Sequence, residues 1–351
     1  MHNPTRLQKR IMAIIAAVLI IGFVAFAVWT LFLRKPAKPA AKPEAPKEQA
    51  TPAPALNPLQ IEAIKARSYP GSAITVEQNL GNQGGYSTQI DSYQSDGLKI
   101  YSLQATPAGT APAGGWPVII LNHGYINPAV YRTNDGSYVN LIGALARAGF
   151  VVFKPDYRGH GQSQGTPEGG HFSPVYTYDD MNLIASIKQT PGLNAARLGT
   201  LGHSLGAHTS LRVAVVSPDI KGTVYLSGVV ASIYDILYNW PHSPMPADLP
   251  AVVQSNREQL LAQYGTPQTN PAFWNSVSAI NYVSNITGKS QINVSQNDSV
   301  VPSAFSAKLN DALVAAGKPV EYYVYPGDDH QFSTNATLAF SRIVAFFKSS
   351  L

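Results

Sequence analysis

The 351-residue sequence contains no cysteine. This absence excludes disulfide bonds, thiol nucleophiles and cysteine-ligated metals, and it fits either a reducing or an oxidising compartment. The sequence also has no P-loop, no His-x-x-x-His pair and no acidic cluster with metal-ligand spacing. We therefore expect an activity that uses neither a metal nor a cofactor, and the missing phosphate loop argues against a nucleotide-dependent enzyme.

Charged residues are scarce, at 13% of the chain. The formal net charge of +5 comes from the first 50 residues, which hold 8 of the 25 Lys and Arg residues and 2 of the 20 Asp and Glu residues. The remaining residues carry 17 basic and 18 acidic side chains and are close to neutral. Such a balance lacks the basic footprint of a nucleic-acid-binding protein, so we expect no nucleic-acid partner.

One long apolar run stands out, from Ile11 to Leu33, after a short basic tail over residues 1–10. Roughly 20 apolar residues span a bilayer, whereas the apolar region of a cleaved signal peptide is about 7–15 residues long. The run ends in Trp29-Thr30-Leu31-Phe32-Leu33-Arg34-Lys35, which is a poor cleavage site. We therefore predict an uncleaved, single-pass signal anchor over residues 11–33, rather than a buried core helix.

The Pro/Ala/Lys-rich residues 34–57 are typical of an extended linker. A strict count of positive charges would put the C-terminal side of the span in the cytoplasm, because five basic residues follow it and three precede it. The short basic N-terminal tail is instead typical of a signal anchor. We expect the N-terminus inside and the following domain outside the cytoplasm.

Residues 58–351 predict an α/β fold with a mainly parallel sheet, because apolar strands alternate with helical patterns. A short helix at 59–66 and a hairpin over 87–101 come first, and Val118–Leu121 and Phe150–Phe153 have the continuous apolar character of buried parallel strands. Further strands are expected near 197–201, 222–226, 291–295 and 320–325. Helices are expected near 141–148, 178–190, 207–216, 302–316 and 334–348.

The alternation is interrupted from residue 232 to residue 287, a segment rich in Tyr, Trp and Pro with one helical piece near 252–264. We interpret this insertion as a cap over the site. Its composition favours an apolar acyl or side-chain pocket, for which the candidate substrate-binding residues are Tyr234, Tyr238, Trp240 and Trp274.

The pentapeptide Gly202-His203-Ser204-Leu205-Gly206 lies between a predicted strand and a predicted helix, the position of a nucleophile elbow. A serine at such a turn sits in strained backbone, and only glycine fits two residues to either side. The N–H of Leu205, at the helix N-terminus, can donate to a developing oxyanion. The pattern therefore predicts Ser204 as a nucleophile, against an alternative in which it is an idle serine in a glycine-bounded turn.

A serine nucleophile needs a base, and the base needs a carboxylate, in the chain order Ser, Asp or Glu, His. Of the three histidines after Ser204, only His330 follows a late strand; His208 lies on the helix after the serine and His242 lies in the cap. Asp298 directly follows the strand before it, and Asp235 is the alternative acid. We predict a triad of Ser204, Asp298 and His330.

The second oxyanion donor should come from the loop after the first long buried strand. That loop contains His123-Gly124-Tyr125, in which glycine allows close approach of the backbone to a substrate. We assign the second donor to the N–H of Tyr125, place its phenol in the pocket wall as a substrate-binding residue, and give His123 a structural role.

Together these motifs resemble the α/β-hydrolase superfamily, and within it the catalytic domain of the prolyl oligopeptidase family and the dienelactone-hydrolase-like enzymes. The segments that carry the resemblance run from about residue 85 to the C-terminus. They are Leu121-Asn122-His123-Gly124, Asp156-Tyr157-Arg158-Gly159-His160-Gly161-Gln162-Ser163, the elbow, Asp298 with Val300-Val301-Pro302, and Asp329-His330.

This resemblance implies an α/β-hydrolase fold and a serine hydrolase that cleaves small ester or peptide substrates through an acyl-enzyme. Both peptidase and carboxylesterase activities fit the motifs. A non-catalytic binding protein with the same fold is the alternative of another class, and the complete triad in the correct chain order argues against it.

Overall fold

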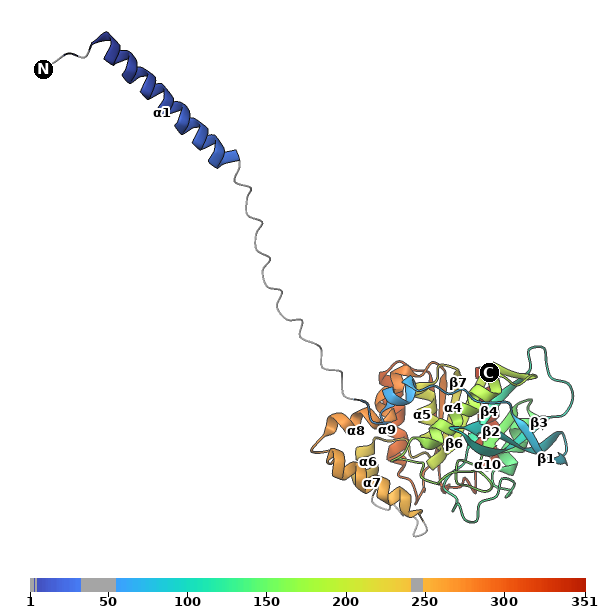
Figure 1. Ribbon diagram of the computed structural model, residues 1–351. Helices are drawn as coiled ribbons and strands as arrows, with labels where there is room; N and C mark the ends of the chain where they lie inside the picture. The colour runs from blue at the N-terminus through green and yellow to red at the C-terminus, as the bar shows by residue number, and fades with distance from the viewer. Residues whose placement is uncertain (1–2, 4, 33–54, 241–248) are drawn as a thin grey trace. The chain divides into compact units, whose positions relative to one another are not determined.

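The structure is a computed structural model that describes residues 3, 5–32, 55–240 and 249–351. The chain divides into two compact units, Met1–Pro54 and Ala55–Leu351. In the first unit, helix α1 (Arg6–Phe32) contains the whole apolar run up to residue 32 (Figure 1). It is long and apolar enough to cross a membrane. Most of the predicted linker, residues 33–54, lies outside the described residues.

The second unit is built on one nine-stranded sheet, with the strand order β1-β2-β3-β5-β4-β6-β7-β8-β9. The first four strands in this order pair antiparallel with one another, and all pairs from β5 onward are parallel. The strands are β1 (Thr75–Asn82), β2 (Tyr86–Ser95), β3 (Leu98–Pro107), β4 (Trp116–Asn122), β5 (Val151–Pro155), β6 (Leu193–His203), β7 (Ile220–Leu226), β8 (Lys289–Ser295) and β9 (Val320–Tyr325).

Helices cover both faces of this sheet. Along β4, Ile119 and Leu121 pack with α3 and α10 in one core cluster, whereas Val118 and Ile120 pack with α4 in another. Since alternate residues of a strand point to opposite faces, these clusters lie on the two sides of the sheet. Outside the cap, the helices of this unit are α2 (Ile61–Ala66), which precedes β1, α3 (Val139–Arg147), α4 (Val175–Lys188), α5 (Leu205–Val216), α9 (Ser303–Ala315) and α10 (Ala336–Ser350), which follows β9.

The predicted cap interrupts the alternation between β7 and β8. Its described elements are α6 (Ile233–Tyr238), α7 (Ala251–Tyr264) and α8 (Pro271–Val277), which Figure 1 shows on one side of the domain, followed by the 3₁₀ helix η1 (Ala279–Asn285). Residues 241–248, which include His242, lie outside the described residues. The cap shares a core cluster with Val229 and Phe305, so it is packed onto the domain by apolar contacts.

The α/β-hydrolase fold is confirmed, and each predicted strand and helix has a counterpart within a few residues. The edge strand β1 has no counterpart among the predictions. Its sequence TVEQNLGN is mostly polar and exposed, and its pairing with β2 shifts register twice, so no period-2 alternation of apolar residues marks it.

Candidate active site

Ser204 lies in the one-residue turn between β6, which ends at His203, and α5, which begins at Leu205. Its φ is +54°, a left-handed conformation that side-chain-bearing residues rarely adopt. A Cβ on Gly206 would lie 2.0 Å from the carbonyl oxygen of Asn122, and one on Gly202 would lie 2.3 Å from the oxygen of Gly206. Both glycines are therefore required for the turn to form, as the elbow pattern predicted.

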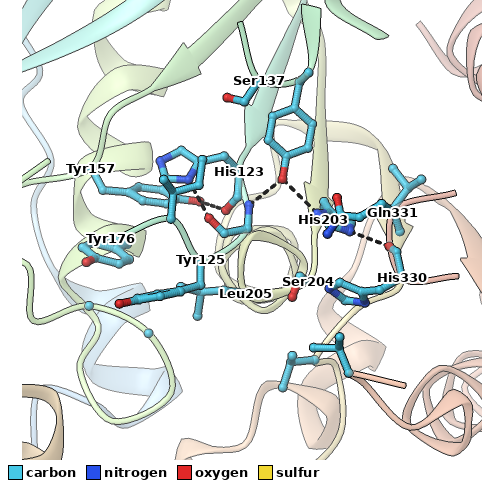
Figure 2. A pocket seen from close by; sticks show the side chains of 18 of the residues that line it. His123, Tyr125, Ser137, Tyr157, Tyr176, His203, Ser204, Leu205, His330 and Gln331 are labelled. Atoms are coloured by element: carbon cyan, nitrogen blue, oxygen red, sulfur yellow. Dashed lines mark hydrogen bonds between the residues drawn. The ribbon is translucent and has the colours of Figure 1, made fainter. Parts of the chain in front are cut away.

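His330 and Asp298 meet at the C-terminal ends of β9 and β8. The Nδ1 of His330 donates to Oδ2 of Asp298 at 2.8 Å, which leaves Nε2 of the imidazole as the lone-pair nitrogen. Figure 2 shows the His330 imidazole next to the side chain of Ser204. The structure thus brings all three predicted triad residues into one place.

The Asp298 side chain is 1% exposed. Burial by itself would raise its pKa, but the hydrogen bond from His330 and those from the Val301 and Val300 amides, both 2.8 Å long, lower it below its usual value. The carboxylate is therefore ionised, and both of its oxygens accept hydrogen bonds: Oδ1 from the loop amides and Oδ2 from the imidazole.

The other aspartates near the site serve as supports. Both carboxylate oxygens of the buried Asp328 accept backbone N–H bonds from its own loop, including those of Thr334 and Asn335, and so hold the turn that carries His330. Asp235, the alternative acid, pairs with Lys308 and accepts hydrogen bonds from Ser232 and Asn239. Its carboxylate is therefore engaged in contacts within and next to α6.

The predicted oxyanion donors lie on the other side of Ser204. Leu205 is the first residue of α5, where amides have no intrahelical partner. The loop after β4 lies directly against Ser204, since a Cβ on Gly124 would be 3.3 Å from the Cβ of Ser204. The N–H of Gly124 donates to the Tyr138 hydroxyl at 2.9 Å, and Tyr125, the predicted second oxyanion donor, is the next residue of this loop.

A chain of hydrogen bonds links this loop to His330 (Figure 2). The Tyr138 hydroxyl and Nδ1 of His203 are 2.8 Å apart, and Nε2 of His203 is 3.0 Å from the carbonyl oxygen of His330. A carbonyl only accepts, so His203 carries its proton on Nε2 and Tyr138 donates to Nδ1. Burial lowers the pKa of His203 to about 4, which keeps this neutral tautomer at pH 7.

His123 has the structural role that we expected. Its Nδ1 donates to the carbonyl of Gly124 at 2.7 Å, and its ring stacks on Tyr131, with centroids 4.8 Å apart. Burial holds its pKa well below the usual value, so the ring is neutral. The Tyr157 hydroxyl donates to the His123 carbonyl, which fixes the same turn from a second strand end.

A cavity of about 990 Å³ opens onto Ser204 and His330. Its size is at the upper end of the range for small-molecule sites. Apolar and aromatic side chains dominate the wall, and they come from the core domain as well as from the cap: Tyr125, Tyr157, Phe172, Tyr176, Leu205, Ile236, Leu237, Trp240, Leu249 and Val253.

Of the four aromatic residues predicted to form the pocket from the cap, only Trp240 lines it; its Nε1 donates to the carbonyl of Val300, beside the acid loop, at 2.7 Å. The prediction for Tyr234 is wrong, because Tyr234 and Tyr238 are 43% and 44% exposed and α6 turns its other face to the cavity. Trp274 is buried in the cap core and donates to the carbonyl of Gly265.

Two residues of the site were missed from the sequence, Tyr138 and His203. His203 lies inside the elbow pentapeptide, so its position next to Ser204 was visible, but its hydrogen-bond partners come from residues 65 and 127 positions away. Tyr138 precedes α3 with φ of +61° and carries no local motif. Among the described residues, no group of three or more His, Asp or Glu side chains could hold a metal ion.

Residues 117–335 match the family model described as serine aminopeptidase, S33. Two curated relatives have lower coverage. A poly(3-hydroxyoctanoate) depolymerase from Pseudomonas fluorescens is 32% identical over 47% of this chain, and an epoxide hydrolase from Caballeronia sordidicola is 29% identical over 34% of it. The matches span 63% and 31% of these relatives' own lengths.

Solved structures agree on the fold. The acetyl xylan esterase from Paenibacillus sp. R4 superposes with a TM-score of 0.62 at 17% identity, over 83% of this chain and 92% of its own. A puromycin-hydrolysing peptidase from Mycobacterium tuberculosis has a TM-score of 0.60 at 19% identity, over 77% of this chain and 40% of its own. Esterases and peptidases therefore both share this architecture.

Proposed function

Since the chain belongs to the serine aminopeptidase S33 family of α/β-hydrolases, we propose that Ser204, His330 and Asp298 are its catalytic triad and that its substrates are acyl esters. The family match and the hydrolases among its relatives support an enzyme over a non-catalytic binding protein, and they are compatible with both esters and peptides as substrates. The observation that carries the triad is the 2.8 Å bond between His330 and Asp298, with Ser204 beside the imidazole.

In acylation, Oγ of Ser204 attacks the substrate carbonyl carbon while Nε2 of His330 takes the hydroxyl proton. The ionised Asp298 stabilises the imidazolium that forms and keeps the ring in the productive tautomer. The carbonyl oxygen becomes an oxyanion, which the amides of Leu205 and Tyr125 stabilise. His330 then gives its proton to the leaving group as the bond to the carbonyl carbon breaks.

In deacylation the same groups act on water. Nε2 of His330 takes a proton from a water molecule as its oxygen attacks the acyl-enzyme carbonyl, and the oxyanion forms again at the two amides. The collapse of this intermediate releases the acid and returns the proton to Ser204. No metal is required in either half of the reaction.

The cavity wall favours esters over peptides in this proposal. An extended peptide is bound through many backbone hydrogen bonds, whereas this wall is mostly aliphatic and aromatic and suits an apolar acyl group. The depolymerase relative, whose name specifies poly(3-hydroxyoctanoate), points to esters of similar character. Peptide hydrolysis is the second candidate, because the matching family is described as serine aminopeptidase.

One assay separates the two candidates. The full chain in detergent, and its Ser204→Ala variant, would be compared on nitrophenyl esters of short and medium acyl chains and on aminoacyl and peptidyl nitroanilides. Ser204-dependent cleavage of the esters with inert anilides supports the esterase. Faster cleavage of the anilides would replace it with a peptidase, and failure of both substrates together with failure of a fluorophosphonate to label Ser204 would refute the triad.

We further propose that α1 anchors the enzyme in a membrane, with the N-terminus in the cytoplasm and the catalytic domain outside it. The length and apolarity of α1 support the anchor, and the short basic N-terminal tail, which is typical of a signal anchor, supports the orientation over the count of basic residues on the two sides of the span. In sealed membrane vesicles of known orientation, a protease added to the cytoplasmic side should leave the catalytic domain intact. Digestion of the catalytic domain from that side would indicate the opposite orientation. Recovery of the chain in the membrane-free fraction would contradict the anchor.

A further inference from the structure

The ionisable groups in the cavity wall are unevenly distributed in sign. Among the lining residues that the structure describes there is no Asp or Glu, while one guanidinium, that of Arg257, and five imidazoles face the space. Asp298 does not line the cavity; its carboxylate is bound to His330, which does. Glu168 does not line it either, although its chain neighbours Pro167 and Gly169 do. A free ammonium group of a substrate would therefore meet no carboxylate in this part of the cavity.

Most of the imidazoles are neutral at pH 7. Burial lowers the pKa of His160 to about 4, that of His171 to about 3 and that of His203 to about 4, and it holds the pKa of His123 well below its usual value. The permanent positive charge in the described wall is therefore that of Arg257.

Arg257 lies on α7 of the cap, one helical turn after Val253, and both side chains line the cavity. Lys308 pairs with Asp235 and Arg158 pairs with Asp179, but Arg257 makes no ion pair or hydrogen bond with any residue of the described chain. Its fork of N–H donors is consequently available to a ligand, and the geometry of that fork matches a carboxylate.

A second positive charge lies behind the wall. Arg212 of α5 is 1% exposed and has no carboxylate partner; it donates instead to the backbone carbonyls of Gly170, His171 and Ser173. Burial lowers the pKa of Arg212 to about 9, so it remains charged at pH 7. Gly170 and His171 line the cavity, and the charge of Arg212 is one of the causes that depress the pKa of His171.

We place the Gly170 part of the wall on the acyl side of the scissile bond. A Cβ on Gly170 would be 3.3 Å from Cδ1 of Leu205, the residue whose amide we propose as an oxyanion donor. The leaving group, by contrast, has to lie next to His330, which protonates it. A substrate placed in this way directs its acyl chain into the part of the cavity formed by Gly170, His171 and the cap.

We propose that the enzyme selects substrates whose acyl group carries a carboxylate remote from the scissile bond, with Arg257 as the residue that binds it and Arg212 as a buried charge that favours it. The proposal rests on the proposed function, because it assigns the specificity of the same cavity. Both positive charges favour a partly desolvated carboxylate in the cavity, and both disfavour an ammonium group there.

Three nitrophenyl esters of equal chain length, ending in a methyl, a carboxylate or an ammonium group, provide the test. The wild-type enzyme should cleave the carboxylate ester with a kcat/KM about tenfold above that for the ammonium ester, equivalent to one modest ion pair. Arg257→Gln should lower the ratio of carboxylate to methyl ester about fivefold, mainly through KM. Lys65→Gln, which removes the positive charge of an exposed residue on α2 that does not line the cavity, is the matched control and should leave every ratio unchanged.

Equal ratios in the wild type and in Arg257→Gln, or a preference for the ammonium ester, would overturn this inference while leaving Ser204-dependent ester cleavage, and hence the proposed function, intact. If no ester is cleaved, the proposed function fails, and the charge preference of the cavity is then tested by ligand binding instead of by kinetics. Thermal stabilisation of Ser204→Ala by octanedioate beyond that by octylammonium, lost in the double variant with Arg257→Gln, would then support it. Equal or reversed stabilisation would refute it.

Discussion

The loops that carry the triad and the cap that closes the pocket differ in how their side chains are held. Asp298 and His330 sit on short loops at the ends of adjacent parallel strands, and each loop is tied by backbone N–H bonds to an aspartate, Asp298 in one and Asp328 in the other. The described cap helices pack largely through apolar contacts, with a few directional links such as those of Trp240 to the Val300 carbonyl and of Asp235 to Lys308, and α7 has no buried residue.

This difference separates chemistry from selectivity. Hydrogen-bonded loops at strand ends hold reacting groups within a narrow range of positions, as catalysis requires. A cap that packs largely through non-directional contacts can change most of its lining residues with little effect on the triad. Substitutions in the two regions should therefore affect different kinetic constants.

The largest effect is expected for Ser204→Ala, which removes the nucleophile. Turnover of a nitrophenyl ester should fall by about 10⁴-fold or more, because no other group can form the acyl-enzyme. The thermal midpoint should change little, since the Ser204 side chain is not part of the core. Ser341→Ala, an exposed serine on α10, should retain full activity and fluorophosphonate labelling. Activity retained by Ser204→Ala would contradict the triad.

Asp298→Asn should lower kcat by about 10³- to 10⁴-fold, because an amide cannot hold the imidazole in the required tautomer or stabilise the imidazolium. The matched variant is Asp235→Asn, at the alternative acid. It should keep the kcat of the wild type and lower the thermal midpoint, since the Asp235 carboxylate accepts a hydrogen bond from Ser232, the N-cap of α6, and pairs with Lys308. The reverse pattern would identify Asp235, and not Asp298, as the acid of the triad.

Tyr138→Phe removes the hydroxyl that links Gly124 to His203 and, through it, to the backbone of His330. We expect kcat to fall about tenfold with little change in KM, because the oxyanion loop and the base lose their shared restraint while the pocket keeps its shape. Tyr323→Phe, whose hydroxyl donates to Glu321 away from the cavity, is the control. A change confined to thermal stability would mean that the link is merely structural.

The smallest effects are expected in the cap. Trp240→Ala should raise KM for medium-chain esters about fivefold through lost apolar contact, with a smaller change in kcat. Tyr234→Ala should match the wild type, because the Tyr234 ring is exposed beside Tyr238 and does not line the cavity. An equal loss in both variants would show that the cap acts as one unit.

Sequence alone determined the elements whose signals are local. The elbow glycines are forced by contacts with backbone atoms, the buried strands are continuous apolar runs, and the chain order of serine, acid and base follows from strand ends that meet at one edge of a parallel sheet. These patterns are enough to predict the fold and all three members of the candidate triad from the sequence.

Only the tertiary structure decided the rest. The partners of His203 lie 65 and 127 residues away, so nothing near the elbow indicates that Tyr138 and the His330 backbone meet there. Composition could not separate Trp240, which faces the cavity, from the exposed Tyr234. The faces of short helices such as α6 are set by what packs against them, and polar side chains that meet through long loops leave no periodic trace in the chain.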